Sequence, residues 1–196
     1  MSKYLLLLIL VLPITLTAQK KQEINWMSWE EAIAAREKFF AEKADSIKAR
    51  QVVPKKIFID LYTSWCGWCK KMDKTTFKDP NVIAYMNRHY YAVKFNAETH
   101  DTISYDGHKF FNQSPPGKKG THTLALSLLD GQMSYPSYVI MDENVHRAHI
   151  IPGYKNAFDL FGILNFFGSN NYLTYKNYVE KTAEQAKSRQ KQVGGQ

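Results

Sequence analysis

Apolar runs and segments of helical periodicity alternate along the chain after residue 55, which is the order expected of an α/β domain. Apolar, β-branched and aromatic residues at 57–62 and 90–96 predict two strands. Between them, a helix is expected to begin at Asp79 and Pro80, because Asp79 can cap it and proline suits the first helical position. We expect this helix to run to about Arg88.

The second half of the chain continues this alternation. Helical spacing at 121–129 is followed by strand-like runs at 137–141 and 147–151. The polar residues 142–144 suit a turn, so the two strands are expected to form a hairpin. A further helix is expected at 156–167, where apolar residues recur at helical spacing.

Two segments stand outside the alternating pattern. A capping box of Ser28 and Glu31 predicts the start of a long charged helix that reaches about Gln51. The polar, turn-rich stretch 98–120 is expected to be an insertion. Within it, the dipeptide at 106–107, Asp-Gly, suits the tip of a hairpin.

At 196 residues, the chain has room for one well-packed domain with additions. The last helix is expected to start near Tyr172. We expect a signal peptide at 1–18, an N-terminal helical extension at 19–54, an α/β domain at 55–168 with its insertion at about 98–120, and a C-terminal helix and polar tail at 169–196.

The first eighteen residues have the pattern of a secretory signal peptide. Lys3 provides a positive start, 4–14 is almost wholly apolar, and the small residue Ala18 precedes polar sequence. We expect cleavage after Ala18 and a periplasmic or secreted protein, with no stable membrane insertion after cleavage. The alternative is an uncleaved anchor helix, but Pro13 interrupts the run, which is shorter than the ~20 residues that span a bilayer.

The charge does not indicate nucleic-acid binding. The chain has a formal net charge of +8, but its basic residues are mixed with acidic ones, as in Arg36, Glu37 and Lys38. With 44% hydrophobic and 22% charged residues, the composition is that of an ordinary globular protein, which argues against extensive disorder and a polytopic membrane protein. We expect no nucleic-acid partner.

The candidate chemistry lies in Cys66 and Cys69, the two cysteines of the chain. They form a Cys-x-x-Cys motif between a predicted strand and a predicted helix, which is the setting of a redox-active pair. A structural role is the weaker interpretation, since a bridge over so short a loop adds little stability. At the first helical turn, unpaired backbone N–H groups are expected to favour Cys66 as the attacking thiolate, and Cys69 to resolve the mixed disulfide.

Other uses of a Cys-x-x-Cys motif lack the residues that they need. A zinc site requires a second pair of ligands, and the only closely spaced histidines, His146 and His149, are too near each other for the usual pattern. Attached c-type haem requires a histidine directly after the second cysteine, where this chain has Lys70. We therefore expect neither a metal ion nor another cofactor.

The residues at 65–72, Trp-Cys-Gly-Trp-Cys-Lys-Lys-Met, and Phe-Lys-Asp-Pro at 77–80 resemble the exported thioredoxin-like proteins of the thioredoxin superfamily. The resemblance covers roughly 57–167. It implies an α/β, thioredoxin-like fold with a central mixed β-sheet flanked by helices. In this chain the fold would carry an N-terminal helical extension and an insertion before the third core helix. The implied activity is that of a thiol-disulfide oxidoreductase.

The resemblance also implies a catalytic acid. Asp60 looks like the buried acid of the family, and Lys94 like its partner. Burial in an apolar strand would raise the pKa of Asp60, so that it could take the proton from Cys69 during resolution. The alternative is a strand-end aspartate that faces solvent.

Tyr135 and Pro136 look like the family's loop with a cis proline, which faces the active site and binds the substrate chain as an added strand. Trp68 replaces the proline that is usual between the cysteines, and Tyr135 precedes the loop proline. Because both positions influence the redox potential in the family, the direction of electron flow stays open. The residues expected to bind substrate are Trp65, Gly67, Trp68, Tyr135 and Pro136.

The expected function is a reductase that keeps protein cysteines reduced in the cell envelope. Its partners would be client proteins with cysteines or disulfides, and a membrane electron donor. One alternative is an envelope disulfide oxidase or isomerase. The other is a non-catalytic thioredoxin-like binding module, which would not need Asp60, Cys66, Cys69 and Pro136 together.

Overall fold

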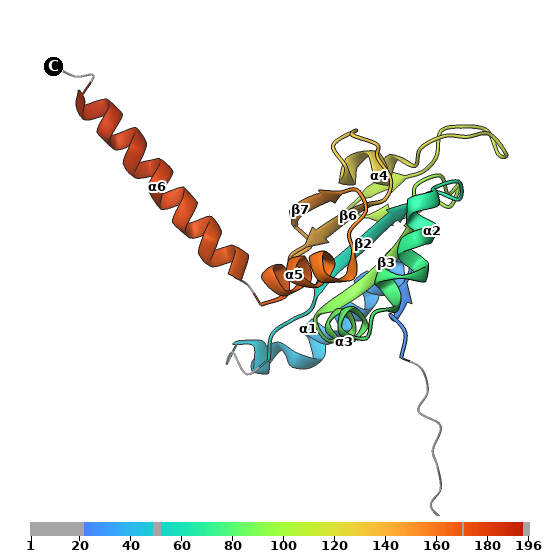
Figure 1. Ribbon diagram of the computed structural model, residues 1–196, viewed down its shortest axis with the longest axis horizontal. Coiled ribbons are helices and arrows are strands. Elements are labelled where there is room, and N and C mark those ends of the chain that lie inside the picture. Colours follow the sequence, from blue (N-terminus) through green and yellow to red (C-terminus); the bar gives the residue numbers. More distant parts are fainter. Residues whose placement is uncertain (1–21, 49–51, 170, 194–196) are drawn as a thin grey trace, which may run out of the picture.

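The computed structural model describes residues 22–48, 52–169 and 171–193. The signal peptide expected at 1–18 and the helix end expected near Gln51 lie outside these residues. The described chain forms a central sheet with helices on both faces, as Figure 1 shows.

The central sheet is mixed, as the resemblance implied. In spatial order, its strands are β1 (Trp26–Met27), β3 (Tyr90–Asn96), β2 (Lys56–Tyr62), β6 (Ser137–Met141) and β7 (Arg147–Pro152). The strands β1, β3 and β2 are parallel, whereas β6 runs antiparallel to β2 and β7 antiparallel to β6. All strands but β1 confirm runs that the sequence pattern predicted, and β6 and β7 form the expected hairpin.

Two layers of helices cover the sheet. On one face lie α1 (Trp29–Lys48) and α4 (Thr123–Leu128), and on the other lie α2 (Gly67–Lys74), α3 (Pro80–His89) and α5 (Ala157–Gly168). Successive side chains of a strand point to opposite faces, so Ile59 of β2 packs toward α1 and α4, whereas Phe58 packs toward the other three helices. Asp60 has the same parity as Phe58 and therefore faces the helix that carries the cysteine motif.

The predicted caps define the starts of two helices. Ser28 and Glu31 form a reciprocal capping box, because each side chain accepts the backbone N–H of the other, at 3.1 and 2.8 Å. The Asp79 carboxylate accepts two backbone N–H groups of the first turn of α3, and Pro80 is the first helical residue. These contacts confirm the predicted starts of α1 and α3.

The strand β1 was not predictable from the sequence pattern. Trp26 and Met27 pair with the middle of β3, and Trp29 and Ala32 of α1 are buried in the core. A strand of two residues is too short to show a hydrophobic period, so its pairing is determined by the sheet and not by local sequence. The N-terminal segment thus belongs to the same sheet and the same core as the cysteine motif.

The stretch 98–120 contains the expected hairpin. Its strands are β4 (Ile103–Tyr105) and β5 (His108–Phe110), which form a separate two-stranded sheet. The two residues of the tip, Asp106 and Gly107, have positive φ angles of 49° and 75°, as the tight hairpin turn requires. The helix predicted at 121–129 is shorter than expected, because α4 begins after the capping residue His122 and ends at Leu128.

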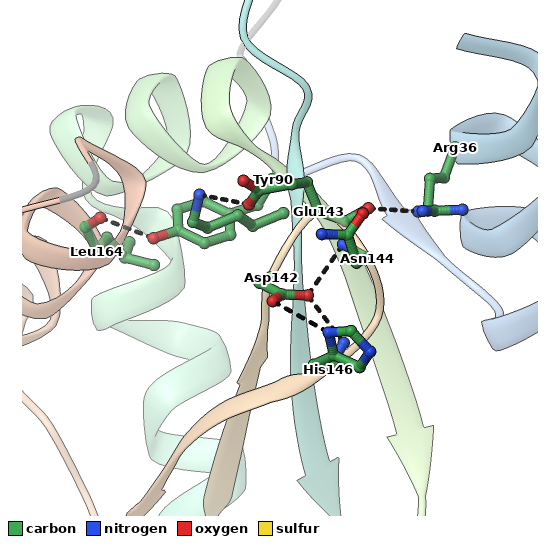
Figure 2. A network of polar contacts seen from close by, with 8 residues as sticks. Arg36, Tyr90, Asp142, Glu143, Asn144, His146 and Leu164 are labelled. Carbon is green, nitrogen blue, oxygen red and sulfur yellow. Dashed lines mark hydrogen bonds and ion pairs between the residues drawn. The ribbon is translucent and has the colours of Figure 1, made fainter. Parts of the chain in front are cut away.

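A polar network fastens the end of β2 that is remote from the cysteines (Figure 2). Lys56 is buried, and its Nζ lies 3.1 Å from a carboxylate oxygen of Glu143 in the β6–β7 turn. Arg36 of α1 donates to the backbone oxygen of Glu143 at 2.6 Å, and Asp142 accepts two backbone N–H groups of the turn. These bonds hold α1, β2 and the hairpin together at the opposite end of the sheet.

Helix α6 (Asn171–Val193) follows α5 and projects away from the sheet in Figure 1. Its first turns pack on α5, where Tyr172 lies 5.2 Å from Phe167 and Tyr175 lies 6.3 Å from Phe166, between ring centroids. The helix begins close to Tyr172, as predicted. In the described residues, each helix is too short or too polar to cross a membrane.

Candidate active site

The two cysteines lie at the junction of β2 and α2, which confirms the predicted order of strand, motif and helix. Cys66 is the N-cap of α2, and the backbone N–H of Cys69 donates to its Sγ at 3.0 Å. The sulfurs are joined in a disulfide, with 5.3 Å between the Cα atoms. Both residues are almost covered, at 4% exposure for Cys66 and 2% for Cys69. The structure therefore shows the oxidised form of the pair.

This position has a chemical consequence for the reduced form. The first N–H groups of a helix have no backbone partners within it, and the helix dipole places partial positive charge at that end. A thiolate at Cys66 is stabilised by both effects. No acidic residue occupies the first turn of α2, so no nearby carboxylate on the helix opposes this stabilisation.

Asp60 and Lys94 form the buried pair that the resemblance implied. They are neighbours in the register of β2 and β3, and Lys94 Nζ lies 2.7 Å from Asp60 Oδ2. Asp60 is 1% exposed, which contradicts the alternative of a solvent-facing aspartate. Burial raises the pKa of Asp60 to about 6; Lys94 opposes this rise, and the negative charge of Asp73 adds to it.

Asp73 is a residue of this site that was not predicted from the sequence. Its carboxylate also pairs with Lys94 Nζ, so that one ammonium group joins β2, β3 and α2. Burial by itself would lower the pKa of Lys94, but the two carboxylates outweigh it, so the pKa is raised. A sequence signal was present, because Asp73 lies one helical turn after Cys69, on the same side of α2.

Tyr138 is a second residue that the sequence did not indicate. It lies directly opposite Asp60 in the antiparallel pairing of β2 and β6, and it stacks on Phe58 with ring centroids 5.5 Å apart. Burial raises the pKa of Tyr138, and the nearby charge of Asp60 raises it further. Its hydroxyl is buried and has no hydrogen-bond partner in the part of the chain that the structure describes.

Tyr135 and Pro136 are joined by the expected cis peptide bond. The Tyr135 ring lies edge-on to Trp65, with centroids 5.9 Å apart. Trp65 is 57% exposed, and its indole N–H donates to both carboxylate oxygens of Glu98, at 3.0 and 3.1 Å. Glu98 was not identified as a site residue from the sequence. Because it lies at the start of the predicted insertion, its bond to Trp65 connects that segment to the cysteine motif.

Trp68 belongs to a separate cluster. It is 56% exposed, and its ring centroid lies 5.3 Å from that of Tyr154, in the loop between β7 and α5. Lys71 Nζ lies 4.8 Å from the Trp68 ring and 5.1 Å from the Tyr154 ring. Gly67, also expected at the site, is the first residue of α2 and has open space around it. Trp65 and Tyr135 thus form one aromatic contact, and Trp68 and Tyr154 form another.

The described residues contain no cluster of three or more His, Cys, Asp or Glu side chains that could hold a metal ion. The chemistry available here is that of two thiols, a buried acid and its cation. Together they can exchange a disulfide with a substrate and move one proton.

Several solved structures are similar to this chain. A thioredoxin-fold protein from Helicobacter pylori has 18% identity and a TM-score of 0.45 over 61% of this chain and 72% of that one. A thioredoxin from Thermus thermophilus has 12% identity and a TM-score of 0.46, over 73% and 85%. The oxidised C-terminal domain of DsbD from Neisseria meningitidis has 18% identity and a TM-score of 0.41, over 74% and 98%. No curated protein matches the chain.

A family model for a thioredoxin-like domain matches residues 42–168, which is well over half of the chain. The match includes both cysteines, the Asp60–Lys94 pair and the cis-proline loop. It confirms the thioredoxin-like fold that the motif implied. The chain belongs to the thioredoxin-like domain family.

Proposed function

We propose that this protein is a thiol-disulfide oxidoreductase that acts on protein cysteines in the cell envelope, mainly as a reductase. The observation that carries the proposal is the joined pair Cys66–Cys69 at the N-terminus of α2, a helix that Lys94 links to a buried aspartate with a raised pKa. A structural bridge would need neither the helix terminus nor the buried acid.

In the proposed cycle, the Cys66 thiolate of the reduced protein attacks one sulfur of a client disulfide. The client S–S bond breaks, a mixed disulfide forms, and the other client sulfur leaves as a thiolate and takes a proton from water. Cys69 then gives its proton to the Asp60 carboxylate and attacks Cys66 Sγ. The client's second sulfur leaves, and two electrons have passed from the protein to the client.

The fold supports the role of Asp60 as proton acceptor. Cys69 and Met72 are the buried residues of α2, and Met72 packs with Phe58 on the sheet face to which Asp60 also points. With a pKa of about 6, Asp60 is mostly ionised at neutral pH, so it is ready to accept a proton. An ionised acceptor favours closure of the Cys66–Cys69 disulfide, which is the step that completes reduction of a client.

Substrate binding is assigned to the surface around the motif. Trp65, Gly67 and Trp68 flank the cysteines, and the loop of Tyr135 and Pro136 offers backbone groups to an extended client segment. Electrons would come from a membrane dithiol protein, because the sequence of residues 1–18 favours export. No metal or other cofactor takes part in this cycle.

The test is capture of clients by single-cysteine variants. With Cys69→Ser, the mixed disulfide at Cys66 cannot be resolved, so client proteins should accumulate as heavy bands that disappear on reduction. Cys66→Ser should capture almost none, because the remaining thiol is the less accessible one. Gel electrophoresis of envelope fractions with and without reductant gives the result.

Alkylation rates and the reduction potential of the unsubstituted protein, together with the capture result, decide between the alternatives. If neither variant captures clients, and both thiols alkylate at the slow rate of an ordinary cysteine, the protein is a non-catalytic binding module. A reduction potential near that of thioredoxin, about −270 mV, supports the reductase, whereas one near the strongly oxidising about −120 mV supports an oxidase.

A further inference from the structure

The exposed ring of Trp68 forms a patch with Lys71 and Tyr154, here called the Trp68 patch. Trp68 and Lys71 lie three residues apart, on one side of α2. Tyr154 completes the patch from the β7–α5 loop, with its ring 5.3 Å from that of Trp68. An exposed tryptophan that is held by a second aromatic ring and a cation offers a large, rigid contact surface, which is typical of binding sites.

Two segments position the Trp68 patch next to the candidate active site: the start of α2 and the β7–α5 loop. Trp68 lies between the two cysteines in the sequence, so its backbone is positioned by the start of α2. Tyr154 directly follows Gly153, whose backbone N–H donates to the oxygen of Pro136 at 2.8 Å. The loop with the cis proline and the loop with Tyr154 are therefore held side by side. A client segment bound at Pro136 would meet the Trp68 patch.

The Trp68 patch carries a positive charge that can pair with an acidic group of a client. Lys71 has cation–π contacts but no carboxylate within ion-pair distance among residues 22–48, 52–169 and 171–193. Lys70 and Lys74 of the same helix are also exposed. The acidic residue of this helix, Asp73, forms its ion pair with Lys94. The other exposed tryptophan differs, because Trp65 is bonded to the carboxylate of Glu98. An acidic client side chain is thus favoured at Trp68 and disfavoured at Trp65.

We propose that the Trp68 patch selects clients that carry a bulky apolar residue and an acidic residue beside the reactive cysteine. The apolar residue packs on the rings of Trp68 and Tyr154, and the carboxylate pairs with Lys71. The opposite charges at Trp68 and Trp65 also fix which way the client segment lies across Cys66. This inference rests on the proposed oxidoreductase function and adds a substrate class to it.

The experiment measures capture of peptides by the full chain with Cys69→Ser, in reduced form. Each peptide has one cysteine, joined as a mixed disulfide to thionitrobenzoate, whose coloured thiolate is released when Cys66 attacks the peptide sulfur. Two peptides differ only in a Glu or a Lys beside a Phe-Cys pair, and a third has Glu with Ser in place of Phe. The same mixed disulfide of 2-mercaptoethanol serves as a small probe without a peptide.

The readout is the ratio of second-order rate constants for the Glu and Lys peptides, which cancels any change in the reactivity of Cys66 itself. At low salt, the unsubstituted patch should favour the Glu peptide by about two- to five-fold, the range expected for one exposed ion pair. Lys71→Glu should reverse the preference, and Lys71→Arg should keep it. The Ser peptide should react more slowly than its Phe counterpart, and Tyr154→Ala should reduce that difference.

Lys70→Glu is the matched control, since it makes the same charge change at an exposed neighbour, whereas the cation–π contact with the Trp68 ring is made by Lys71. If Lys70→Glu reverses the preference as strongly as Lys71→Glu, general charge is responsible and the inference is wrong. It is also wrong if all peptides react equally while the small probe still reacts; the proposed function then stands. If the small probe does not react either, the proposed function itself fails.

Discussion

Asp60 shows how burial and two neighbouring charges set the ionisation of one side chain. Burial disfavours its carboxylate, and Lys94 at 2.7 Å only partly compensates, so that its pKa rises from 3.8 to about 6. Asp73 shares Lys94 and weakens the compensation. Asp60 can therefore exchange a proton near neutral pH, whereas an exposed aspartate would stay ionised.

We expect Asp60→Asn to slow resolution of the mixed disulfide by about 100-fold or more, because Cys69 loses its proton acceptor. In the unsubstituted protein, the rate should fall as pH drops through about 6, since Asp60 accepts a proton only when ionised. Stopped-flow measurement of a single turnover with a model disulfide tests this. Asp45→Asn, at an exposed aspartate of α1, is the control. Equal rates for Asp60→Asn and the unsubstituted protein from about pH 6 to about pH 8 would contradict the role.

Unfolding is not expected to explain a slow Asp60→Asn variant. Between pH 3.8 and about 6, the folded state holds more protons at Asp60 than the unfolded state does, so stability falls as pH rises through this window. At neutral pH the buried carboxylate therefore destabilises the folded state, and asparagine, which carries no charge, removes this penalty. The variant should therefore be at least as stable as the unsubstituted protein.

At the scale of elements, His122 joins the stretch 98–120 to the main core. It is fully buried at the N-cap of α4, where its Nδ1 accepts the backbone N–H of Leu124 at 3.2 Å. Its Nε2 lies 3.0 Å from the backbone oxygen of Asp101, and its own backbone N–H donates to Ala97. These contacts require a neutral ring that carries its proton on Nε2.

We expect His122 to destabilise the folded protein as pH falls below about 6.5, because burial lowers the pKa of His122 in the folded state and the unfolded chain takes up the proton first. Asp60 acts in the opposite direction, so the contribution of His122 is read from the difference between variants. His122→Asn keeps a side-chain oxygen for the cap but cannot titrate, so the free energy of unfolding at about pH 5, relative to that at about pH 7.5, should be higher in this variant than in the unsubstituted protein. Urea unfolding of the oxidised protein at about pH 5 and about pH 7.5 measures it. His108→Asn, at an exposed histidine of β5, should behave like the unsubstituted protein. If the free energy of unfolding changes equally between the two pH values in His122→Asn and in the unsubstituted protein, groups other than His122 cause the pH dependence.

At the scale of the whole molecule, the two ends of β2 have different roles. The cysteine motif follows one end, where the loops of Pro136 and Tyr154 and the residue Glu98 gather around it. The buried Lys56–Glu143 pair holds the other end (Figure 2). The sheet thus provides a rigid base for the candidate site, while α6 extends from the far side of α5 (Figure 1).

For the whole chain we predict export and cleavage after Ala18, because a charged start, an apolar run and a small residue precede polar sequence. The mature protein should begin at Gln19 and be found in the envelope or outside the cell. Sequencing its N-terminus from separated cell fractions decides this. A chain that keeps Met1 and stays in the cytoplasm would remove the support for an envelope function.

The sequence by itself determined the features that depend on neighbouring residues. The strands β2 and β6 are short apolar runs, and the starts of α1 and α3 are set by the Ser28 box and by Asp79, so each was predictable from a few adjacent positions. The Cys-x-x-Cys motif and its place between a strand and a helix are equally local. The family resemblance of this motif then supplied Asp60, Lys94 and the cis bond at Pro136.

Only the tertiary structure decided which distant residues meet at the site. Asp73 pairs with Lys94 because α2 packs on the face of the sheet to which both Asp60 and Lys94 point. Glu98 contacts Trp65, and Tyr154 contacts Trp68. In both pairs the two residues are far apart in the sequence, so no hydrophobic period along the chain indicates the contact. The strand β1 exists because β3 offers it an edge. Such contacts depend on how whole elements pack against one another, and no short stretch of sequence contains that information.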